Sequence, residues 1–538
     1  MPHTPTANTL FYGDNLQILR DYVADESVDL IYLDPPFNSN ASYNVLFKSP
    51  TGEQSAAQIE AFDDTWHWNI SAEKAFDEVV QSGNSDAANM LIAMRSFLGD
   101  NDMMAYLAMM AVRLIELHRV LKPTGSLYLH CDPTASHYLK ILLDAVFGAK
   151  HYKNEIAWKR TTAHSDTKGR FSHETDIILF YTKSNYGIWN PQYEKHSESY
   201  ISSHYSHSDS TGRLYRHDNI IRSQSMGFRP NLSYEYKGFT PPYGWRTVKA
   251  KLEEIDNNGR LHWSKSGTPY LIRYLDEQKG EIVGNLWDDI SPVNSQAQER
   301  LGYPTQKPVA LLERILAASS NEGDVVLDPF CGCGTTVHAA QKMGRRWLGI
   351  DITHLAIGLI QRRLTDAFPM ATYDVVGVPK DLGAAQKLAE ADKYEFQKWA
   401  LSLVEAQPYK GGKKGSDGGV DGYIFFKPDG KTTAKAVVSV KGGGVTDSQV
   451  KDLIVTVDHE KAQMGVFVTL LPPTKPMIAR AAAAGFYKTE WGEYPKVQIL
   501  TIADLLDGKR PHMPWLDAAA FKKAKVEPAV VDQGRLDL

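Results

Sequence analysis

The chain has 538 residues and a formal net charge of −5, and 43% of its residues are hydrophobic while 23% are charged. The length excludes a single ordinary domain, and three cysteines exclude a disulfide framework. No apolar stretch is long enough to span a bilayer, and the first ten residues do not resemble a signal peptide, so we expect a cytoplasmic protein. The acidic balance does not exclude DNA binding, which depends on where the basic residues lie.

The first informative element is residues 28–33 (VDLIYL), an apolar run that predicts a strand buried on both faces and ending at Asp34. Ligands of open α/β sheets bind at that edge. The Asp34 carboxylate and the Pro35 carbonyl, stiffened by Pro36, can both accept hydrogen bonds from an exocyclic amine, and Phe37 can stack on the ring. A base in a duplex must be flipped out to reach such a site. The alternative is a strand-end turn with a buried aromatic residue.

A helix is predicted at residues 104–120, a turn at 122–125 (KPTG) and a strand at 126–130 (SLYLH). The composition then changes, because residues 151–300 are rich in Tyr, Ser, His, Asn and Gly. This region is either a surface that contacts DNA phosphates or a solvated basic loop. Its basic residues include Lys153, Lys159, Arg160, Lys168, Arg170, Arg213, Arg216, Arg222, Arg229 and Lys237.

The α/β pattern returns after residue 309. A strand at 325–327 leads through Asp328 into a glycine turn at 332–334 (GCG), and a helix begins at Thr335. This arrangement is typical of a loop that holds a nucleoside cofactor, and Asp351, about twenty residues further on, stands where an acid can bind ribose hydroxyls. A phosphate-binding loop is disfavoured because no lysine directly follows the glycines. Two nearby cysteines are too few for a zinc site.

The order of these two motifs resembles the β-class amino-methyltransferases of DNA, in which the catalytic motif comes first and a target-recognition region separates it from the S-adenosylmethionine motif. Residues 12–15 (YGDN), 121–125 (LKPTG) and 303–308 (YPTQKP, with Tyr303 replacing a histidine) are similar to further segments of that family. The resemblance covers about residues 10–365. It implies catalytic roles for Asp34, Pro35, Pro36 and Phe37. It also implies cofactor-binding roles for Asp14, Thr305, Lys307, Asp328, Phe330, Gly332, Gly334, Thr335 and Asp351.

The resemblance implies a site-specific enzyme that transfers a methyl group from S-adenosylmethionine to the N6 amine of a flipped adenine in double-stranded DNA. With an aspartate at position 34, the motif resembles that of adenine-N6 enzymes, because cytosine-N4 enzymes more often carry serine at this position. A cytosine-N4 enzyme stays as an alternative. The long region between the motifs disfavours an RNA or protein-amine methyltransferase. Two intact motifs disfavour a DNA-binding regulator with an inactive methyltransferase fold.

A second change of composition falls near residues 368–388, and another α/β unit follows. We expect a helix at 389–404, a glycine-rich stretch at 410–419, and strands at 422–426 and 435–441. The fold class is therefore α/β throughout, with a Rossmann-like methyltransferase first. The predicted domains are a catalytic half (1–150), a target-recognition region (151–300), a cofactor-binding half (301–368), a linker (369–388), an endonuclease-like domain (389–510) and a tail (511–538).

This last unit resembles the Mrr-like restriction-endonuclease fold. The resemblance implies that Asp421 and Glu395 bind Mg²⁺ and that Lys441 polarises the scissile phosphate. Ser439 stands where that family has a carboxylate or glutamine, so we expect weak or absent cutting. The alternatives are a bifunctional restriction–modification enzyme and an unrelated α/β unit. The expected partner is double-stranded DNA. A second copy of the chain, forming a homodimer, and a separate restriction or defence subunit are further candidate partners. No membrane association is expected.

Overall fold

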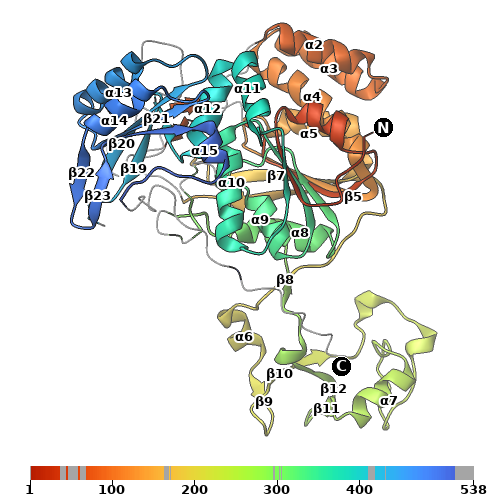
Figure 1. The fold of residues 1–538 in the computed structure, drawn as a ribbon. Helices are drawn as coiled ribbons and strands as arrows, with labels where there is room; N and C mark the ends of the chain where they lie inside the picture. The colour runs from red at the N-terminus through yellow and green to blue at the C-terminus, as the bar shows by residue number, and fades with distance from the viewer. Residues whose placement is uncertain are drawn as a thin grey trace. The chain divides into compact units, whose positions relative to one another are not determined.

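The computed structural model of the protein divides into two compact units (Figure 1). Residues 1–190 together with 285–538 form the main unit, and residues 191–284 form the inserted unit. The structure describes residues 2–36, 44–46, 58–60, 68–162, 169, 171–294, 297, 299–301, 303, 306–409, 419–429, 432–514 and 527.

A nine-stranded sheet forms the centre of the main unit, in the order β14-β6-β7-β5-β2-β15-β16-β1-β17. Six neighbouring strands of this sheet, β5-β2-β15-β16-β1-β17, are parallel to one another. Strand β7 runs antiparallel to its two neighbours, β5 and β6. Every residue of β2 is buried, as its apolar sequence predicts. The strands are β1 (Thr9–Tyr12), β2 (Val28–Leu33), β5 (Leu121–Cys131), β6 (Tyr152–Lys159), β7 (Thr175–Thr182), β14 (Leu286–Trp287), β15 (Val325–Asp328), β16 (Arg346–Asp351) and β17 (Asp374–Val376).

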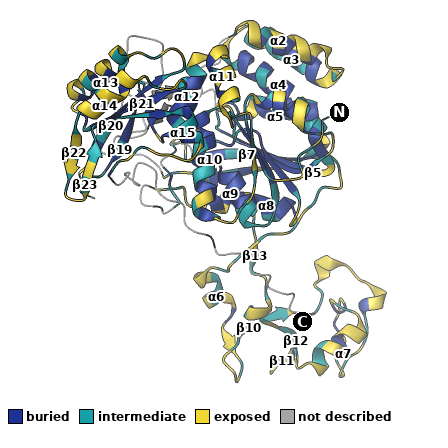
Figure 2. Cartoon of the chain, viewed as in Figure 1, coloured by how far each residue is buried: buried dark blue, intermediate teal, exposed yellow. Residues whose placement is uncertain are grey.

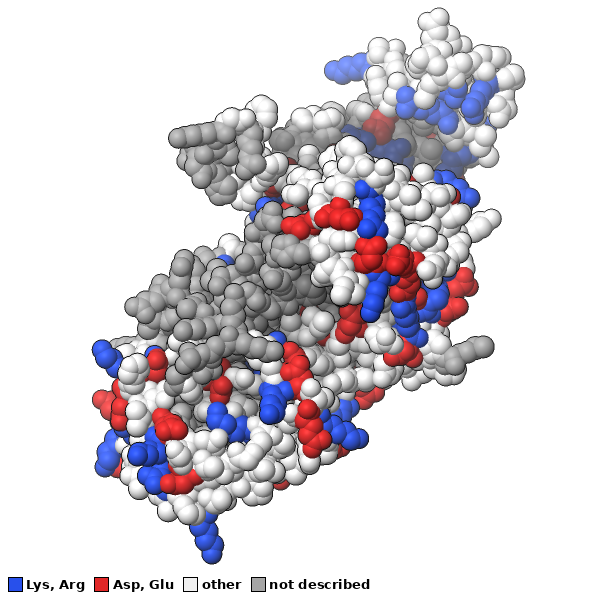
Figure 3. All heavy atoms as spheres, turned by 90° about the horizontal axis from the view of Figure 1, so that it is seen from above, with Lys and Arg blue, Asp and Glu red and all other residues white. Residues whose placement is uncertain are grey.

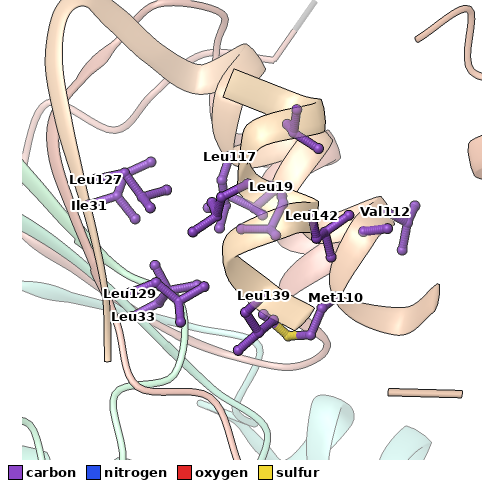
Figure 4. Close-up of a cluster of buried hydrophobic side chains, with 14 of the residues drawn as sticks. Leu19, Ile31, Leu33, Met110, Val112, Leu117, Leu127, Leu129, Leu139 and Leu142 are labelled. Atoms are coloured by element: carbon purple, nitrogen blue, oxygen red, sulfur yellow. The ribbon is translucent and has the colours of Figure 1, made fainter. Parts of the chain in front are cut away.

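Helices cover this sheet and supply much of the core (Figures 1 and 2). Leu19, Leu117 and Leu142 come from three different helices and pack with Ile31 and Leu127 of the sheet (Figure 4). Burying each such side chain stabilises the fold by about 1.5–3 kcal/mol. The helices are α1 (Asn15–Tyr22), α2 (Ile70–Gln81), α3 (Ser85–Leu98), α4 (Asp102–Val120), α5 (Ser136–Phe147), α8 (Val309–Ser319), α9 (Thr335–Lys342) and α10 (His354–Ala367). Two further strands, β3 (Asn44–Leu46) and β4 (Gln58–Glu60), pair with each other outside the main sheet.

The structure differs from the sequence-based expectation at two places in this sheet. Strands β6 and β7 belong to the main sheet, so the inserted unit begins at Pro191 and the region 151–300 is not one domain. The reason is that β7 (TDIILFYT) is apolar and pairs with β5 in the core. Residues 122–125 do not form a turn between a helix and a strand. They lie inside β5, where the pairing with β2 shifts register.

The C-terminal part of the main unit is built on a five-stranded sheet in the order β18-β19-β20-β21-β24, with hydrophobic clusters that pack against it. The expected helix at 389–404 is two helices, because Asp392 ends one and caps the next. The strands of this sheet are β18 (Gln407–Pro408), β19 (Gly422–Phe426), β20 (Ala434–Lys441), β21 (Met464–Thr469) and β24 (Val497–Thr501). A separate hairpin consists of β22 (Phe486–Thr489) and β23 (Gly492–Pro495). The helices are α11 (Leu382–Ala391), α12 (Lys393–Leu403), α13 (Asp447–His459), α14 (Lys475–Ala483) and α15 (Ile502–Leu506).

The inserted unit holds a four-stranded antiparallel sheet in the order β11-β12-β10-β9 and a small core around Trp245. Several of its basic residues pair with acids of the same unit, such as Arg213 with Asp276 and Arg216 with Asp218. Its elements are α6 (Glu198–His204), α7 (Lys249–Asn257), β8 (Tyr193–Glu194), β9 (His207–Ser208), β10 (Leu214–Asn219), β11 (Leu261–Trp263), β12 (Pro269–Tyr274) and β13 (Glu281–Ile282). Among the described residues of the whole chain, no helix has both the length and the apolar character needed to cross a membrane.

Candidate active site

Three acids meet at one edge of the main sheet. Strands β2, β15 and β16 are parallel neighbours, so their carboxyl ends lie side by side. Asp34 directly follows β2, while Asp328 and Asp351 are the last residues of β15 and β16. The fold therefore brings together two motifs that are far apart in the sequence. This edge is where open α/β sheets bind their ligands.

Asp34 is held by a lysine from the cofactor half of the chain. Its Oδ2 accepts a hydrogen bond from Nζ of Lys307 at 2.6 Å, and the two side chains are only 18% and 11% exposed. The Lys307 carbonyl oxygen accepts a hydrogen bond from Thr335 Oγ1 at 3.3 Å. Lys307 thus touches both motifs, which the sequence did not predict. Pro35 is buried, and Phe37 lies outside the described residues, so its stacking role stays a prediction.

The glycine turn after β15 has a backbone that only glycine adopts easily. Gly332 and Gly334 have φ values of +52° and +74°, in the left-handed region. A Cβ atom at Gly334 would lie 2.8 Å from Ile360 Cγ1. Before the turn, Asp328 Oδ1 accepts a hydrogen bond from the backbone N–H of Phe330 at 2.9 Å, and burial raises the pKa of Asp328 to about 7.

Asp351 connects the glycine turn to the loop that follows β16. Its Oδ2 accepts a hydrogen bond from the Gly332 N–H at 2.9 Å, and its Oδ1 accepts one from the Thr353 N–H at 2.9 Å. Burial raises the pKa of Asp351 to about 6. The carbonyl oxygen of Asp351 accepts a hydrogen bond from the Gly13 N–H at 3.0 Å. One acid therefore organises three loops at this edge, and a carboxylate oxygen can accept more than one hydrogen bond.

Asp14 and Thr335 have structural partners of their own. Asp14 caps α1 by accepting from backbone N–H groups of its first turn, and its Oδ2 accepts from Nη2 of the buried Arg113 at 2.8 Å. Its side chain is still 47% exposed, so it can also meet a ligand. Thr335 is buried and accepts from Arg363 Nη1 at 3.2 Å. Thr305 lies outside the described residues. Sequence reasoning missed both arginines, because each lies in the middle of a helix with no local motif.

A buried polar chain runs from β2 across the sheet. Tyr32, two residues before Asp34, places its hydroxyl 2.9 Å from His130 Nδ1, and His130 Nε2 lies 3.1 Å from Asp176 Oδ2. Asp176 Oδ1 forms an ion pair with Arg160 Nε at 3.1 Å. Burial lowers the pKa of His130, which favours its neutral form. This chain ties β2, β5 and β7 together, and single residues on three separate strands leave no signal in the sequence.

A second cluster lies in the C-terminal part, around Asp421. Its Oδ2 accepts hydrogen bonds from the Val440 N–H at 2.6 Å and from Ser439 Oγ at 3.2 Å, and Lys441 Nζ lies 3.6 Å away. Its Oδ1 accepts from Gln397 Nε2 at 2.6 Å. The structure brings Asp421 and Lys441 together and adds Gln397, which sequence reasoning missed; their roles at a metal site stay a prediction.

Glu395 does not join that cluster, and its prediction as a metal ligand needs correction. It precedes Gln397 by two positions on α12, and two steps along a helix turn the side chain by about 200°. Glu395 Oε2 instead accepts a hydrogen bond from the Tyr12 hydroxyl at 2.5 Å. Among the residues that the structure describes, which omit 410–418, no three His, Cys, Asp or Glu side chains are grouped so that they could hold a metal ion.

The family to which the chain belongs follows from comparison with known proteins. A family model described as "DNA methylase" matches residues 28–362, which include both motifs and the acids at the sheet edge. The chain belongs to the DNA methylase family. A second model, described as "Restriction endonuclease", matches residues 388–491, which contain the Asp421 cluster. The methylase thus carries a C-terminal domain similar to restriction endonucleases.

Individual relatives cover most of the methylase region. The type II methyltransferase M.EcaI of Enterobacter cloacae is 29% identical over 394 residues, which are 72% of this chain and 76% of the relative. The DNA adenine methyltransferase YhdJ of Escherichia coli is 25% identical over 390 residues, covering 72% of this chain and 94% of the relative. Among solved structures, TTHA0409 of Thermus thermophilus, described as "Putative DNA Modification Methylase" and complexed with S-adenosyl-L-methionine, is 17% identical. The match covers 69% of this chain and 99% of that one, with a TM-score of 0.35.

Proposed function

We propose that this DNA methylase transfers a methyl group from S-adenosylmethionine to the N6 amine of an adenine flipped out of double-stranded DNA. The observation that carries the proposal is the position of Asp34 and Pro35 at the end of β2, beside the glycine turn of β15. Two acceptors there can bind the two hydrogens of an exocyclic amine, which frees the nitrogen lone pair from ring conjugation. Aspartate at position 34 and the adenine specificity named for YhdJ favour adenine over cytosine.

The residues at the sheet edge fit a nucleoside cofactor that carries no phosphate. Asp14 and Asp351 offer carboxylate acceptors suited to hydroxyl and amine groups, and the glycine turn allows a close approach of the backbone. Residues 332–340 contain no lysine or arginine to bind phosphate. Asp351 and Asp14 would hold the nucleoside, and S-adenosylmethionine supplies an electrophilic methyl group when it is bound. The chain's own contribution is to orient the amine and to exclude water from it.

The base and the site can be identified together. The full chain would be expressed in a host without DNA methylation, and modified bases would be mapped by single-molecule sequencing. We expect N6-methyladenine at one short sequence motif. N4-methylcytosine would support the cytosine alternative, and unmodified DNA from a host that produces folded, soluble protein would contradict the proposal. A homodimer, a separate restriction subunit and a cytoplasmic location stay predictions.

Cofactor binding should weaken in acid. Burial raises the pKa of Asp351 to about 6, so its carboxylate becomes protonated as the pH falls through that value and accepts hydrogen bonds less well. We expect the affinity for S-adenosylmethionine, measured by calorimetry, to fall by roughly tenfold per pH unit below about 6. The variant Asp351→Asn should bind weakly at neutral pH and lose this pH dependence. An unchanged pH profile in that variant would assign the titration to another group.

The inserted unit should choose the DNA sequence. Glu194 and Glu281 face each other in the antiparallel β8–β13 pair, so a two-residue turn can replace residues 195–280. We expect this deletion to keep cofactor affinity, to lose sequence specificity, and to make DNA affinity less dependent on salt, because fewer phosphates are contacted. Mapping methylated bases and measuring binding at several salt concentrations would test it. Retained specificity would place recognition elsewhere, most simply in the C-terminal domain.

We further propose that the C-terminal domain cleaves DNA weakly or not at all. Ser439 offers a hydroxyl where Mg²⁺ prefers a carboxylate, and Glu395, the second acid expected to bind the ion, is hydrogen-bonded to Tyr12 instead. Ser439→Glu should create or raise Mg²⁺-dependent nicking of unmethylated DNA, and adding Lys441→Ala should lower it again by about 10²-fold or more. If the wild-type protein already cuts and Lys441→Ala stops it, the bifunctional alternative is correct.

A further inference from the structure

The cofactor edge of the methylase sheet is in contact with the C-terminal domain of the same unit. Tyr12, the last residue of β1, donates its hydroxyl hydrogen to Glu395 Oε2 at 2.5 Å. Glu395 lies on α12, which packs against α10 of the methylase. A second contact joins the same region, because Arg362 Nη1 of α10 pairs with Glu405 Oε2 at 3.0 Å. The first of these contacts reaches the loops that carry the cofactor acids.

Tyr12 connects the loop after β1 with the loop after β16. Its partner in the strand register is Asp351, and Asp14 follows two positions later. The Tyr12 ring stacks on the ring of His354, with centroids 3.8 Å apart and planes inclined by 15°. His354 is the first residue of α10, three positions after Asp351. The stacked pair therefore sets the spacing between the loops that carry the two acids.

The charge state of this contact favours a strong hydrogen bond at neutral pH. Burial alone would raise the pKa of Glu395, but hydrogen bonds from Tyr12 and from Lys398 Nζ, at 2.9 Å, outweigh it and hold the pKa below its usual value. Burial lowers the pKa of His354 to about 4, so its ring is neutral, and Glu395 Oε2 lies 3.9 Å from its Nε2. A neutral phenol thus donates to an ionised carboxylate, and such bonds are about twice as strong as neutral ones.

We propose that Glu395 is a positioning residue of the methyltransferase's cofactor site, supplied by the C-terminal domain. It holds Tyr12 against His354 and thereby fixes the loops of Asp14 and Asp351 in the arrangement that binds S-adenosylmethionine. The inference rests on the proposed function, because it takes these two acids as cofactor ligands. The domain that resembles a nuclease then has a role in methylation whether or not it cuts DNA.

Calorimetry and steady-state kinetics on full-length variants test this role. Glu395→Ala should raise the Kd and the KM for S-adenosylmethionine by about 3- to 30-fold, the range for residues that act through a neighbour, with kcat nearly unchanged. Glu395→Gln keeps an acceptor for the Tyr12 hydroxyl and should restore most of the affinity. Tyr12→Phe keeps the ring stack and removes the donor, so it should match Glu395→Ala, and the double variant should be no worse than either single one.

The chain offers a matched control within the C-terminal domain. Glu460 Oε2 accepts a hydrogen bond from the Tyr423 hydroxyl at 2.7 Å and also pairs with Lys435 at 3.1 Å. Glu460→Ala therefore removes the same kind of contact without touching the methylase, and it should leave the Kd and KM unchanged. Equal weakening by Glu460→Ala, or wild-type affinity in Glu395→Ala, would overturn the proposal. A wild-type protein that binds no S-adenosylmethionine would instead refute the proposed function, and the inference with it.

Discussion

Replacing Asp34 by alanine should lower the rate of methyl transfer by about 10²–10³-fold, because it removes an acceptor positioned for the reacting amine. The affinity for S-adenosylmethionine should stay close to that of the wild type, since the glycine turn and the helix after it keep their hydrogen bonds to Asp351 and to the Lys307 carbonyl when the Asp34 side chain is removed. Single-turnover transfer of a labelled methyl group to DNA measures the rate, and calorimetry measures the affinity. Asp34→Asn keeps one acceptor oxygen and loses the charge, so its rate should be intermediate.

A neighbouring strand provides the control for this substitution. Asp132 and Pro133 directly follow β5, and Asp132 Oδ1 accepts a hydrogen bond from the Thr134 N–H at 3.0 Å. Asp132→Ala therefore removes an aspartate that, like Asp34, lies between a strand end and a proline. It costs about 1 kcal/mol for each of the two local hydrogen bonds that Asp132 accepts, from the Thr134 and Ala135 N–H groups. It should leave the transfer rate nearly unchanged. Turnover near the wild-type level in Asp34→Ala would contradict the catalytic assignment.

Replacing Gly334 by valine should reduce S-adenosylmethionine affinity by at least about tenfold. A branched residue at φ +74° costs about 1–2 kcal/mol, and its Cβ would stand 2.8 Å from Ile360 Cγ1, so the turn must move. Displacement of the turn also breaks the hydrogen bond between the Gly332 N–H and Asp351. Calorimetry measures the affinity, and thermal unfolding shows how much of the change is lost stability.

Gly358 is the matched control for that experiment. It lies in α10, near Ile360, and a Cβ there would meet nothing within 4 Å. Gly358→Ala should keep the cofactor affinity and stabilise the helix by roughly 0.5–1 kcal/mol. Gly334→Ala should fall between Gly358→Ala and Gly334→Val in its effect. Unchanged affinity in Gly334→Val would show that the turn does not approach the cofactor.

Local chemistry explains where the sequence-based predictions agree with the structure. The strand at 28–33 and the strand at 422–426 have the predicted bounds, because apolar runs bounded by turn residues depend mainly on near neighbours. The glycine turn at 332–334 was also predictable, since a positive φ favours glycine whatever surrounds it. The charged residues of the surface do not indicate a binding site in the same direct way. Figure 3 shows Lys and Arg mixed with Asp and Glu over much of the face in view.

The sequence by itself determined the fold class, the order of the two motifs and the family, because each depends on short segments whose residues act together. Only the tertiary structure decided which side chains meet. The sequence predicted a helix that carries Glu395, but the packing of α12 against both β20 and α10 directs Gln397 toward Asp421 and Glu395 toward Tyr12. The pairing of Lys307 with Asp34 has the same cause. Contacts between distant elements depend on how whole helices and strands pack, and no local pattern encodes that.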